Sequence, residues 1–515
     1  MSKFLVTALL AALVVLAGCG EEERQPASGG DGGSQRAELR TVYTQDPTGG
    51  LDPDAFYDIE GESTILSVYE GLLRYKEGTS QLEPSLARSY AVSSDGRTYT
   101  FALRPGVVFH DGTPLDAGAV VGAFERRTAL EGGPSYVLEP VASVRASDAT
   151  TVVVRLKAPN AAFPHFLASM YGPKVISPKA LRDHAGDDDA ARWLRNHAVG
   201  TGPYRLASYT VGQRITLERF DRYWGPKANT RGVQIAIVPN VGDQVLRLRS
   251  GQLDVIPHGI TASQLRSLRG NDDLAVTTPD ALIRPVLGFN VSRPPFDDRD
   301  ARRAVLGALD IKGAVQQIYG DVARPAAEFI PPALLPSATN PLRKPEAGSG
   351  SRPSAPITLG YNQAETDNRL LAEFFQRQLE EAGYEVRLQG DSGGDQFAYA
   401  GDLKAAPELA ITTLNPDAAH PEAWMRSIYG TGGGLNLLGY SNPQLDRQLD
   451  RAVSESDPAQ AQKLYAQAAQ TAQDDAATWP LADVRDTIVS RKDVAGFGHV
   501  PAYIWVVNFA KVKAG

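Results

Sequence analysis

The sequence predicts an α/β protein with more than one hydrophobic core. Two stretches, 233–256 and 357–388, each follow the order strand, helix, strand, which is typical of parallel sheets. The chain has 515 residues. Roughly 480 of them follow a distinct leading segment, which is more than a single core usually holds. We therefore expect two or three hydrophobic cores, with the two α/β stretches in different ones.

The stretch 357–388 is the clearer of the two units. Ile357–Tyr361 and Tyr384–Leu388 have the pattern of strands, and Gly383 is placed to end the helix between them. Asp367 is placed to cap the start of that helix. Its apolar face is formed by Leu371, Phe374, Phe375 and Leu379. This unit is expected to have a core separate from the first.

The other elements follow from the same patterns. In the stretch 233–256, Val233–Val238 and Asp254–Ile256 are expected to be parallel strands, joined by a helix over Gln244–Leu253. A helix is also expected over Ile65–Leu73. Leu409–Leu414 is a further strand, which opens into Asn415, Pro416 and Asp417.

The N-terminus has the pattern of a targeting segment. Lys3 precedes an apolar run over Phe4–Leu16, too short to span a bilayer and typical of a signal peptide. Leu16-Ala17-Gly18-Cys19 matches a bacterial lipobox, so we expect residues 1–18 to be removed and Cys19 to carry a diacylglyceryl anchor. Residues 19–37, rich in Glu, Gly and Ser, then form a flexible tether.

The stretch Leu82–Arg127 has the most distinctive sequence in the chain. Asp95-Gly96 and Asp111-Gly112 mark turns around a strand at Thr98–Leu103, and Asp116 is placed to cap a helix over Ala119–Arg127. This stretch resembles the signature of extracytoplasmic solute-binding proteins of the peptide/nickel class, which serve oligopeptide and dipeptide ABC importers. Further matches at 200–206 and 437–443 extend the resemblance over about 39–515.

The resemblance implies a periplasmic-binding-protein-like fold, with two α/β lobes joined by a hinge and an extra α+β subdomain in the first lobe. It places lobe I at 38–283, with the subdomain at about 55–195. Lobe II is expected at 284–480, and residues 481–515 return to lobe I.

Composition and motifs point away from catalysis and nucleic acid. The formal net charge is −8, which argues against a nucleic-acid partner. No phosphate loop, zinc-protease motif or nucleophile elbow occurs, and the seven His residues are scattered without ligand spacing. The single Cys excludes an internal disulfide. We expect no enzyme activity, no cofactor and no metal, although a dispersed triad would escape such a search.

Candidate ligand-binding residues follow from the strand ends. Ligands of open α/β sheets bind beyond the carboxyl ends of the strands, which indicates Tyr361, Asn415 and Asp417 in the second lobe. The same rule indicates Tyr43 across the cleft and Asn290 at the crossing between lobes. Trp424 is a further candidate, as either a ligand contact or a core residue.

One position departs from the family pattern. Peptide-binding relatives have a carboxylate at the end of the strand that finishes here in Leu414, where it pairs with the amino group of the peptide. Asp417 follows three residues later. A buried ammonium group without a counter-charge is strongly destabilised. Either Asp417 replaces the missing carboxylate, or the ligand has no free amino terminus.

The resemblance favours a substrate-binding lipoprotein of an ABC importer that captures a solute, with a peptide as first choice, by hinge closure. It would be an extracytoplasmic monomer, lipid-anchored to the bacterial cell membrane, that delivers its ligand to a membrane permease. Alternatives are a binding protein for a sugar, an opine or another polar metabolite, and a surface receptor that senses without transport. A surface hydrolase has no support in the sequence.

Overall fold

The computed structural model describes residues 38–130, 133–345 and 355–515. The predicted signal peptide, Cys19 and the tether lie outside them. The central sheet of lobe I has the order β1-β10-β9-β8, in which β1 and β10 are parallel and the other pairs are antiparallel. Its strands are β1 (Glu38–Tyr43), β8 (Tyr204–Thr210), β9 (Arg214–Arg219) and β10 (Gly232–Ile237).

A second sheet of lobe I is antiparallel throughout, with the order β4-β5-β7-β6. Its strands are β4 (Ala87–Val92), β5 (Thr98–Leu103), β6 (Val141–Asp148) and β7 (Thr151–Leu156). The predicted capped helix is confirmed as α2 (Ala117–Ala129), because the Asp116 side chain accepts a hydrogen bond from the Ala119 amide at 2.9 Å.

The predicted helix over Ile65–Leu73 is wrong at both ends. Helix α1 spans Glu62–Val68, Tyr69 is already extended, and β2 (Leu73–Tyr75) follows. A Cβ atom at Gly71 would lie 2.8 Å from the carbonyl oxygen of Pro173. Close packing against that neighbouring segment therefore selects an extended path where the apolar pattern alone suggested a longer helix.

Lobe II is built on a five-stranded sheet with the order β16-β15-β17-β13-β18. Strand β15 is parallel to both β16 and β17, whereas β13 is antiparallel to β17 and β18. The strands are β13 (Arg284–Phe289), β15 (Ile357–Asn362), β16 (Val386–Asp391), β17 (Leu409–Leu414) and β18 (Thr478–Pro480). The strand–helix–strand unit predicted at 357–388 is confirmed in type and direction.

The helix of this unit is α10 (Thr366–Glu381), and it starts two residues earlier than a cap at Asp367 predicts. Leu371, Phe375 and Leu379 are buried, and Gly383, with φ +86°, follows its end as expected. Asp367 is not the cap, because the N-cap residue is Glu365, which makes no side-chain capping bond. The Glu365 carboxylate instead accepts hydrogen bonds from Asn362, Asn368 and Thr413.

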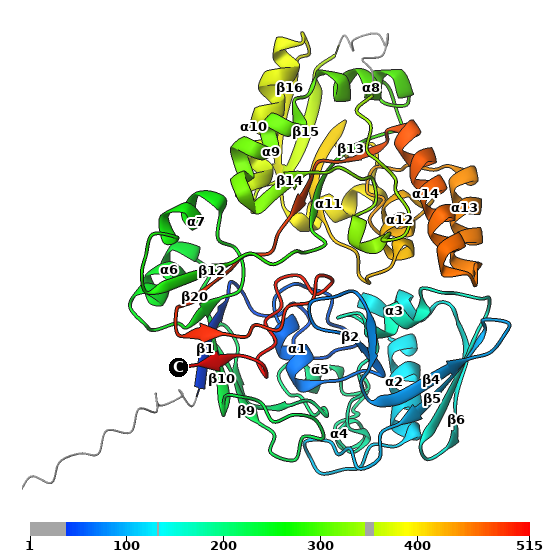
Figure 1. The fold of residues 1–515 in the computed structure, drawn as a ribbon, viewed down its shortest axis with the longest axis vertical. Coiled ribbons are helices and arrows are strands. Elements are labelled where there is room, and N and C mark those ends of the chain that lie inside the picture. The colour runs from blue at the N-terminus through cyan, green and yellow to red at the C-terminus, as the bar shows by residue number, and fades with distance from the viewer. Residues whose placement is uncertain (1–37, 131–132, 346–354) are drawn as a thin grey trace, which may run out of the picture. The chain divides into compact units, whose positions relative to one another are not determined.

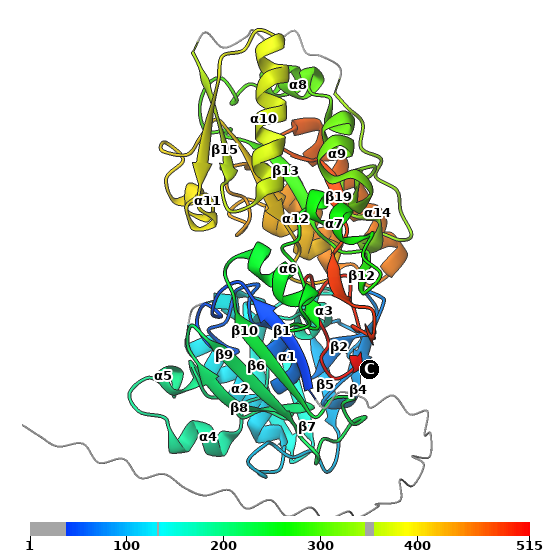
Figure 2. The same ribbon diagram turned by 90° about the vertical axis from the view of Figure 1, so that its left-hand side faces the viewer.

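Further helices complete lobe II. Figure 2 shows α9 and α10 side by side along the sheet, and Figure 1 shows the antiparallel pair α13 and α14. The bounds of these helices are α8 (Arg299–Ala308), α9 (Ile311–Tyr319), α11 (Gly393–Ala398), α12 (Pro421–Tyr429), α13 (Pro443–Ser454) and α14 (Pro458–Asp475).

A three-stranded sheet with the order β11-β20-β12 marks the return of the chain to lobe I. Its strands are β11 (Val255–Ile256), β12 (Leu274–Thr277) and β20 (Ile488–Arg491). The parallel sheet predicted for the stretch 233–256 is wrong, since β10 and β11 lie in different sheets and β11 pairs antiparallel with β20. Asp254, just before β11, instead holds the Arg40 side chain of β1 at 2.6 Å. The strand that pairs with β11 is therefore β20, which comes from the C-terminal part of the chain.

The chain passes twice between the lobes. The first passage lies between β12 and β13, and the second lies between β19 (Ala482–Val484) and β20. Strand β19 still pairs with β14 (Ala323–Pro325), before β20 joins the other lobe.

The unit 357–388 packs Ile357, Leu371 and Phe375 into a cluster that is separate from the main cluster of lobe I, but neither cluster is confined to one lobe. One continuous cluster contains Tyr75 and Tyr503 together with Leu414, Ala419 and Trp424, and so includes residues from both lobes. The loop after β17 packs against lobe I through Ala419 and His420, and contacts of this kind between distant segments cannot be read from local patterns. The lobes meet along this loop.

Candidate functional site

The side chain of Asp417 lies where the two lobes meet. Strand β17 ends at Leu414, and the next three residues bring the Asp417 carboxylate to the surface of lobe II that contacts lobe I. Asp417 is 9% exposed. Its Oδ2 atom accepts a hydrogen bond from the Tyr57 hydroxyl at 2.8 Å and another from the Tyr136 hydroxyl. Two neutral donors from one lobe therefore reach a carboxylate of the other.

A cluster of three tyrosines surrounds this carboxylate. The ring of Tyr57 lies edge-on to Tyr171, with 4.6 Å between the ring centroids, and 6.4 Å from Tyr136. The Tyr171 hydroxyl donates to Glu62 Oε1 at 2.9 Å. Tyr57 is 43% exposed although it is aromatic. We call Asp417, Glu62 and the three tyrosines the tyrosine–carboxylate cluster.

The backbone around Asp417 is held by lobe I as well. The Ser169 hydroxyl donates to the carbonyl oxygen of Asp417. The amide of Ala419 donates to the Tyr75 hydroxyl at 2.8 Å, and that hydroxyl donates to the carbonyl oxygen of His165 at 3.1 Å. The position of this loop therefore depends on how the lobes are placed.

Burial dominates the electrostatics of the cluster. It raises the pKa of Asp417, and the hydroxyls of Tyr136 and Tyr57 offset only part of that rise. Burial also raises the pKa of Glu62 well above its usual range, since the Tyr171 hydroxyl is its one donor and nearby carboxylates oppose its charge. Carboxylates short of donors and of counter-charge favour a positively charged guest.

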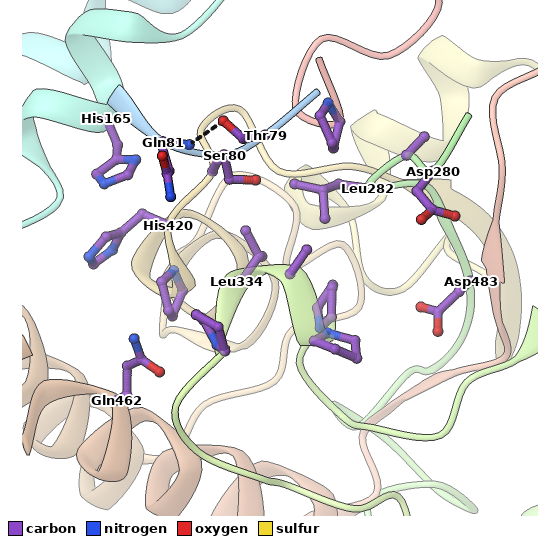
Figure 3. A pocket seen from close by; sticks show the side chains of 18 of the residues that line it. Thr79, Ser80, Gln81, His165, Asp280, Leu282, Leu334, His420, Gln462 and Asp483 are labelled. Carbon is purple, nitrogen blue, oxygen red and sulfur yellow. Dashed lines mark hydrogen bonds between the residues drawn. The ribbon is translucent and has the colours of Figure 1, made fainter. Parts of the chain in front are cut away.

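A cavity of about 760 Å³ is lined in part by the end of the same loop, at Ala419, His420 and Pro421. Residues of both lobes and of both passages between them line it, including Leu282, Leu334, Ala419 and Val484. Figure 3 shows His165 and His420 together at one end, near Gln81. The lining does not include Asp417 or the ends of β15 and β16. The cavity is therefore distinct from the edge at which α/β sheets bind ligands.

The two histidines of this cavity are held in the neutral form. Their ring centroids are 5.1 Å apart. Burial lowers the pKa of His165 to about 4. The pKa of His420 falls well below its usual range because of burial and, to a smaller extent, because of His165. The amide of Glu422 donates to His420 Nδ1 at 3.2 Å, which leaves the proton of the neutral ring on Nε2.

His165 should make stability depend on pH. Since its pKa is lower in the folded state than in the unfolded chain, acid favours unfolding as pH falls from about 6.5 to 4. Between pH 7 and pH 5, we expect the wild type to lose about 1–2 kcal/mol more stability than His165→Gln does. Urea unfolding at both pH values measures the difference. Equal losses in the two proteins would contradict the expectation.

The residues predicted to bind ligand fall in different environments. Tyr361 and Asn415 are half-buried, at the ends of β15 and β17. Tyr43 is buried, with its hydroxyl 2.9 Å from that of Thr64. Asn290 is 1% exposed and donates to the carbonyl oxygen of Leu403 at 2.8 Å. Trp424 is fully buried under the Arg284 guanidinium, 5.8 Å from the ring centroid.

The sequence reasoning missed Tyr57, Tyr136, Tyr171 and Glu62. They lie in lobe I, outside any strand end, and no local pattern links them to Asp417. The one signal available was composition, because Tyr57 lies in a stretch, 44–62, that contains six acidic residues and no Lys or Arg.

The described residues form neither a group of metal ligands nor a membrane-spanning helix. In the ranges 38–130, 133–345 and 355–515, no three His, Cys, Asp or Glu side chains gather as metal ligands. Within those same ranges, no helix has the length and apolar character needed to cross a bilayer.

Comparison with known proteins decides the family. Residues 81–436 match the model of the bacterial extracellular solute-binding proteins, family 5. This chain belongs to that family. Family 5 members are extracellular by this description, so the chain functions outside the cytoplasm. The resemblance seen in the sequence is thereby confirmed.

Two relatives match along most of the chain. The probable D,D-dipeptide-binding periplasmic protein DdpA of Escherichia coli (strain K12) is 28% identical over 473 residues, 89% of this chain and 91% of the relative. The glutathione-binding protein GsiB of Pectobacterium atrosepticum is 27% identical over 474 residues, covering 88% and 90%.

Solved structures of similar proteins share the fold. The periplasmic binding protein DppA from Helicobacter pylori, in complex with the peptide STSA, aligns with a TM-score of 0.80 and 23% identity, over 93% of this chain and 98% of that one. NikA from Brucella suis, in complex with Fe(III)-EDTA, aligns with a TM-score of 0.82 and 20% identity, over 93% and 100%. The predicted two-lobed periplasmic-binding-protein-like fold is confirmed.

Proposed function

We propose that this protein is the substrate-binding lipoprotein of an ABC importer and that it captures a peptide between its lobes. The observation that carries the proposal is the Asp417 carboxylate, which is buried at the lobe boundary with only tyrosine hydroxyls as side-chain donors. The amino terminus of a peptide supplies the positive charge that this carboxylate lacks. The sequence left open whether Asp417 replaces the carboxylate of the family or the ligand has no free amino terminus. This proposal adopts the first alternative.

The names of the relatives agree with a peptide ligand. DdpA is named for D,D-dipeptides and GsiB for glutathione, and the H. pylori protein holds a peptide. Tyr361 and Asn415, at the ends of neighbouring strands β15 and β17, are the proposed contacts for the peptide backbone. Tyr43, Asn290 and Trp424 would act indirectly, because their side chains are buried among other residues.

Capture would work by a change in the angle between the lobes. The two passages of the chain, at 278–283 and 485–487, act as the hinge in this proposal. The boundary of lobe II would then lie a few residues beyond Pro480, because β19 still pairs with β14. A peptide that touches Asp417 and lobe I together has different affinities for the open and closed states, and that difference drives closure.

The remaining parts of the proposal concern location. Cys19 would carry the lipid anchor and residues 19–37 would form the tether, which keeps a monomeric binding protein near its membrane permease. No catalytic step and no cofactor belong to this function.

A pair of matched peptides tests the proposal. Trialanine has a free amino terminus, whereas N-acetyl-trialanine has the same backbone without the charge. We expect calorimetry to detect binding of trialanine and at least tenfold weaker binding of the acetylated form. Native mass spectrometry of gently purified protein would identify a peptide that co-purifies. Equal affinity for both peptides would show that the amino group does not contribute to binding. If neither peptide binds, the proposal of a peptide ligand is wrong.

A further inference from the structure

The three loops that follow β15, β16 and β17 are acidic. These strands are adjacent and parallel, so their carboxyl ends lie at one edge of the lobe II sheet. Segments 362–367, 391–398 and 415–421 contain no Lys or Arg. They carry five carboxylates, those of Glu365, Asp367, Asp391, Asp395 and Asp417. The edge at which a ligand is expected is therefore negatively charged.

The facing segment of lobe I, residues 44–62, is acidic too. Four of its six carboxylates have partners that account for them. Asp52 and Asp54 pair with Arg126 and Arg127. Glu60 lies 3.4 Å from His258, and Asp46 accepts hydrogen bonds from Tyr209 and the Gly212 amide. Asp58 and Glu62 remain. Among the described residues, Asp58 accepts hydrogen bonds only from the backbone amides of Thr48 and Ile59, and neither carboxylate forms a salt bridge with any described Lys, Arg or His.

Glu62 belongs to the tyrosine–carboxylate cluster with Asp417, and the Asp58 carboxylate lies near enough to oppose the charge of Glu62. Tyr57 bonds to Asp417 and stacks edge-on against Tyr171, whose hydroxyl lies 2.9 Å from Glu62 and 3.2 Å from the carbonyl oxygen of Asp58. Glu62 is 2% exposed. Its Oε2 atom is buried and has no hydrogen-bond partner among the described residues. A buried, unpartnered carboxylate oxygen within an acidic cluster indicates that a donor is missing from the site.

We propose that the ligand carries two positive charges: an amino terminus held by Asp417 and a basic side chain held by Glu62 and Asp58. The inference rests on the proposed function, and it narrows the substrate class to cationic peptides that contain Lys or Arg. A charged donor at Glu62 completes the hydrogen bonding of Oε2 and supplies a counter-charge that no described residue of the chain provides.

The state of Glu62 adds a second consequence. Burial raises its pKa well above the usual range, which favours the protonated form in the empty protein. A cation bound beside it favours the ionised form, so the proton leaves when the ligand binds. Binding of a basic peptide is therefore expected to release more protons than binding of a neutral peptide.

A peptide series with one variable side chain tests the proposal. Each position of trialanine is replaced in turn by Lys, Met or Glu, and calorimetry gives the affinity of each peptide in two buffers of different ionisation enthalpy. Met is the control for Lys, because it has similar length and no charge. We expect one Lys peptide to bind at least tenfold more tightly than its Met counterpart and to release more protons. The Glu counterpart should be the weakest.

Variants locate the effect. In Glu62→Gln the ratio of Lys to Met affinities should fall close to one, and Asp58→Asn should lower it in part. Glu218→Gln, which changes a surface pair with Arg205, should leave the ratio as in the wild type. Equal affinities for Lys and Met peptides at all three positions, in a protein that binds trialanine, would overturn the inference and leave the proposed function intact. If no peptide of the series binds, the proposed function fails instead.

Discussion

Replacing Asp417 by asparagine should lower the affinity for a peptide with a free amino terminus by about 30- to 1,000-fold. Loss of one partner of a buried, hydrogen-bonded charge pair weakens binding by about 2–4 kcal/mol. Asparagine keeps the size of the side chain, and its oxygen still accepts from Tyr57 or Tyr136, so the loop should keep its place. Calorimetry with trialanine, or with the tightest peptide found, measures the loss.

The control for this variant is Asp450→Asn. It makes the same chemical change in lobe II, at an exposed residue that contacts Arg426 at 3.0 Å. Its affinity should equal that of the wild type. N-acetylated peptide provides a second control, because removal of Asp417 should make little difference to a ligand without the ammonium group. If Asp417→Asn binds both peptides as the wild type does, Asp417 is not the anchor of the ligand.

Asp54→Ala should destabilise the protein by about 3–5 kcal/mol. The Asp54 carboxylate is fully buried and accepts from Arg126 Nη1 at 2.6 Å and from Arg127 Nε at 2.8 Å. Its removal leaves two buried guanidinium groups with the single carboxylate of Asp52, and that uncompensated charge is the source of the loss. The midpoint of urea unfolding, followed by circular dichroism, should fall accordingly.

Asp187→Ala is the matched control, since Asp187 also contacts an arginine, Arg192, but lies on the surface. Exposed ion pairs contribute little because water screens both charges. Its unfolding midpoint should be that of the wild type. If the unfolding midpoint of Asp54→Ala changes little, water reaches the guanidinium groups of Arg126 and Arg127 and the expectation is wrong. Tyr57, which bonds to Asp417, lies three residues after Asp54 in the chain. Loss of the Asp54 ion pairs should therefore disturb Tyr57 as well, and ligand affinity should fall together with stability.

Local elements were predictable where one physical rule decides the outcome. The Asp116 cap, the strand Thr98–Leu103 and the strand–helix–strand order of the unit 357–388 formed as expected, because capping, alternation and a terminating glycine act over a few residues. The cap predicted at Asp367 did not form. The errors arose where a distant segment intervened. Helix α1 ended early at a close approach to Pro173, and β11 paired with a strand more than two hundred residues away.

The candidate site divides in the same way. Asp417 was predictable because it follows a strand, and ligand sites lie beyond strand ends. The tyrosines were not, because their relation to Asp417 exists only after two separate stretches of chain have folded and met. Glu62 is the extreme case, since nothing in its neighbourhood in the sequence shows that its Oε2 atom will be buried without a donor.

The sequence by itself determined the family, the α/β class and the acidic character of the segments around the site. These properties depend on residue types and their short-range spacing, which are present before folding. Only the tertiary structure decided which carboxylates lose their water and which gain an arginine, because desolvation and ion pairing depend on residues far apart in the chain. In the folded protein Asp417 and Glu62 lose water and gain no arginine. Because they have no counter-charge, we infer a cationic ligand.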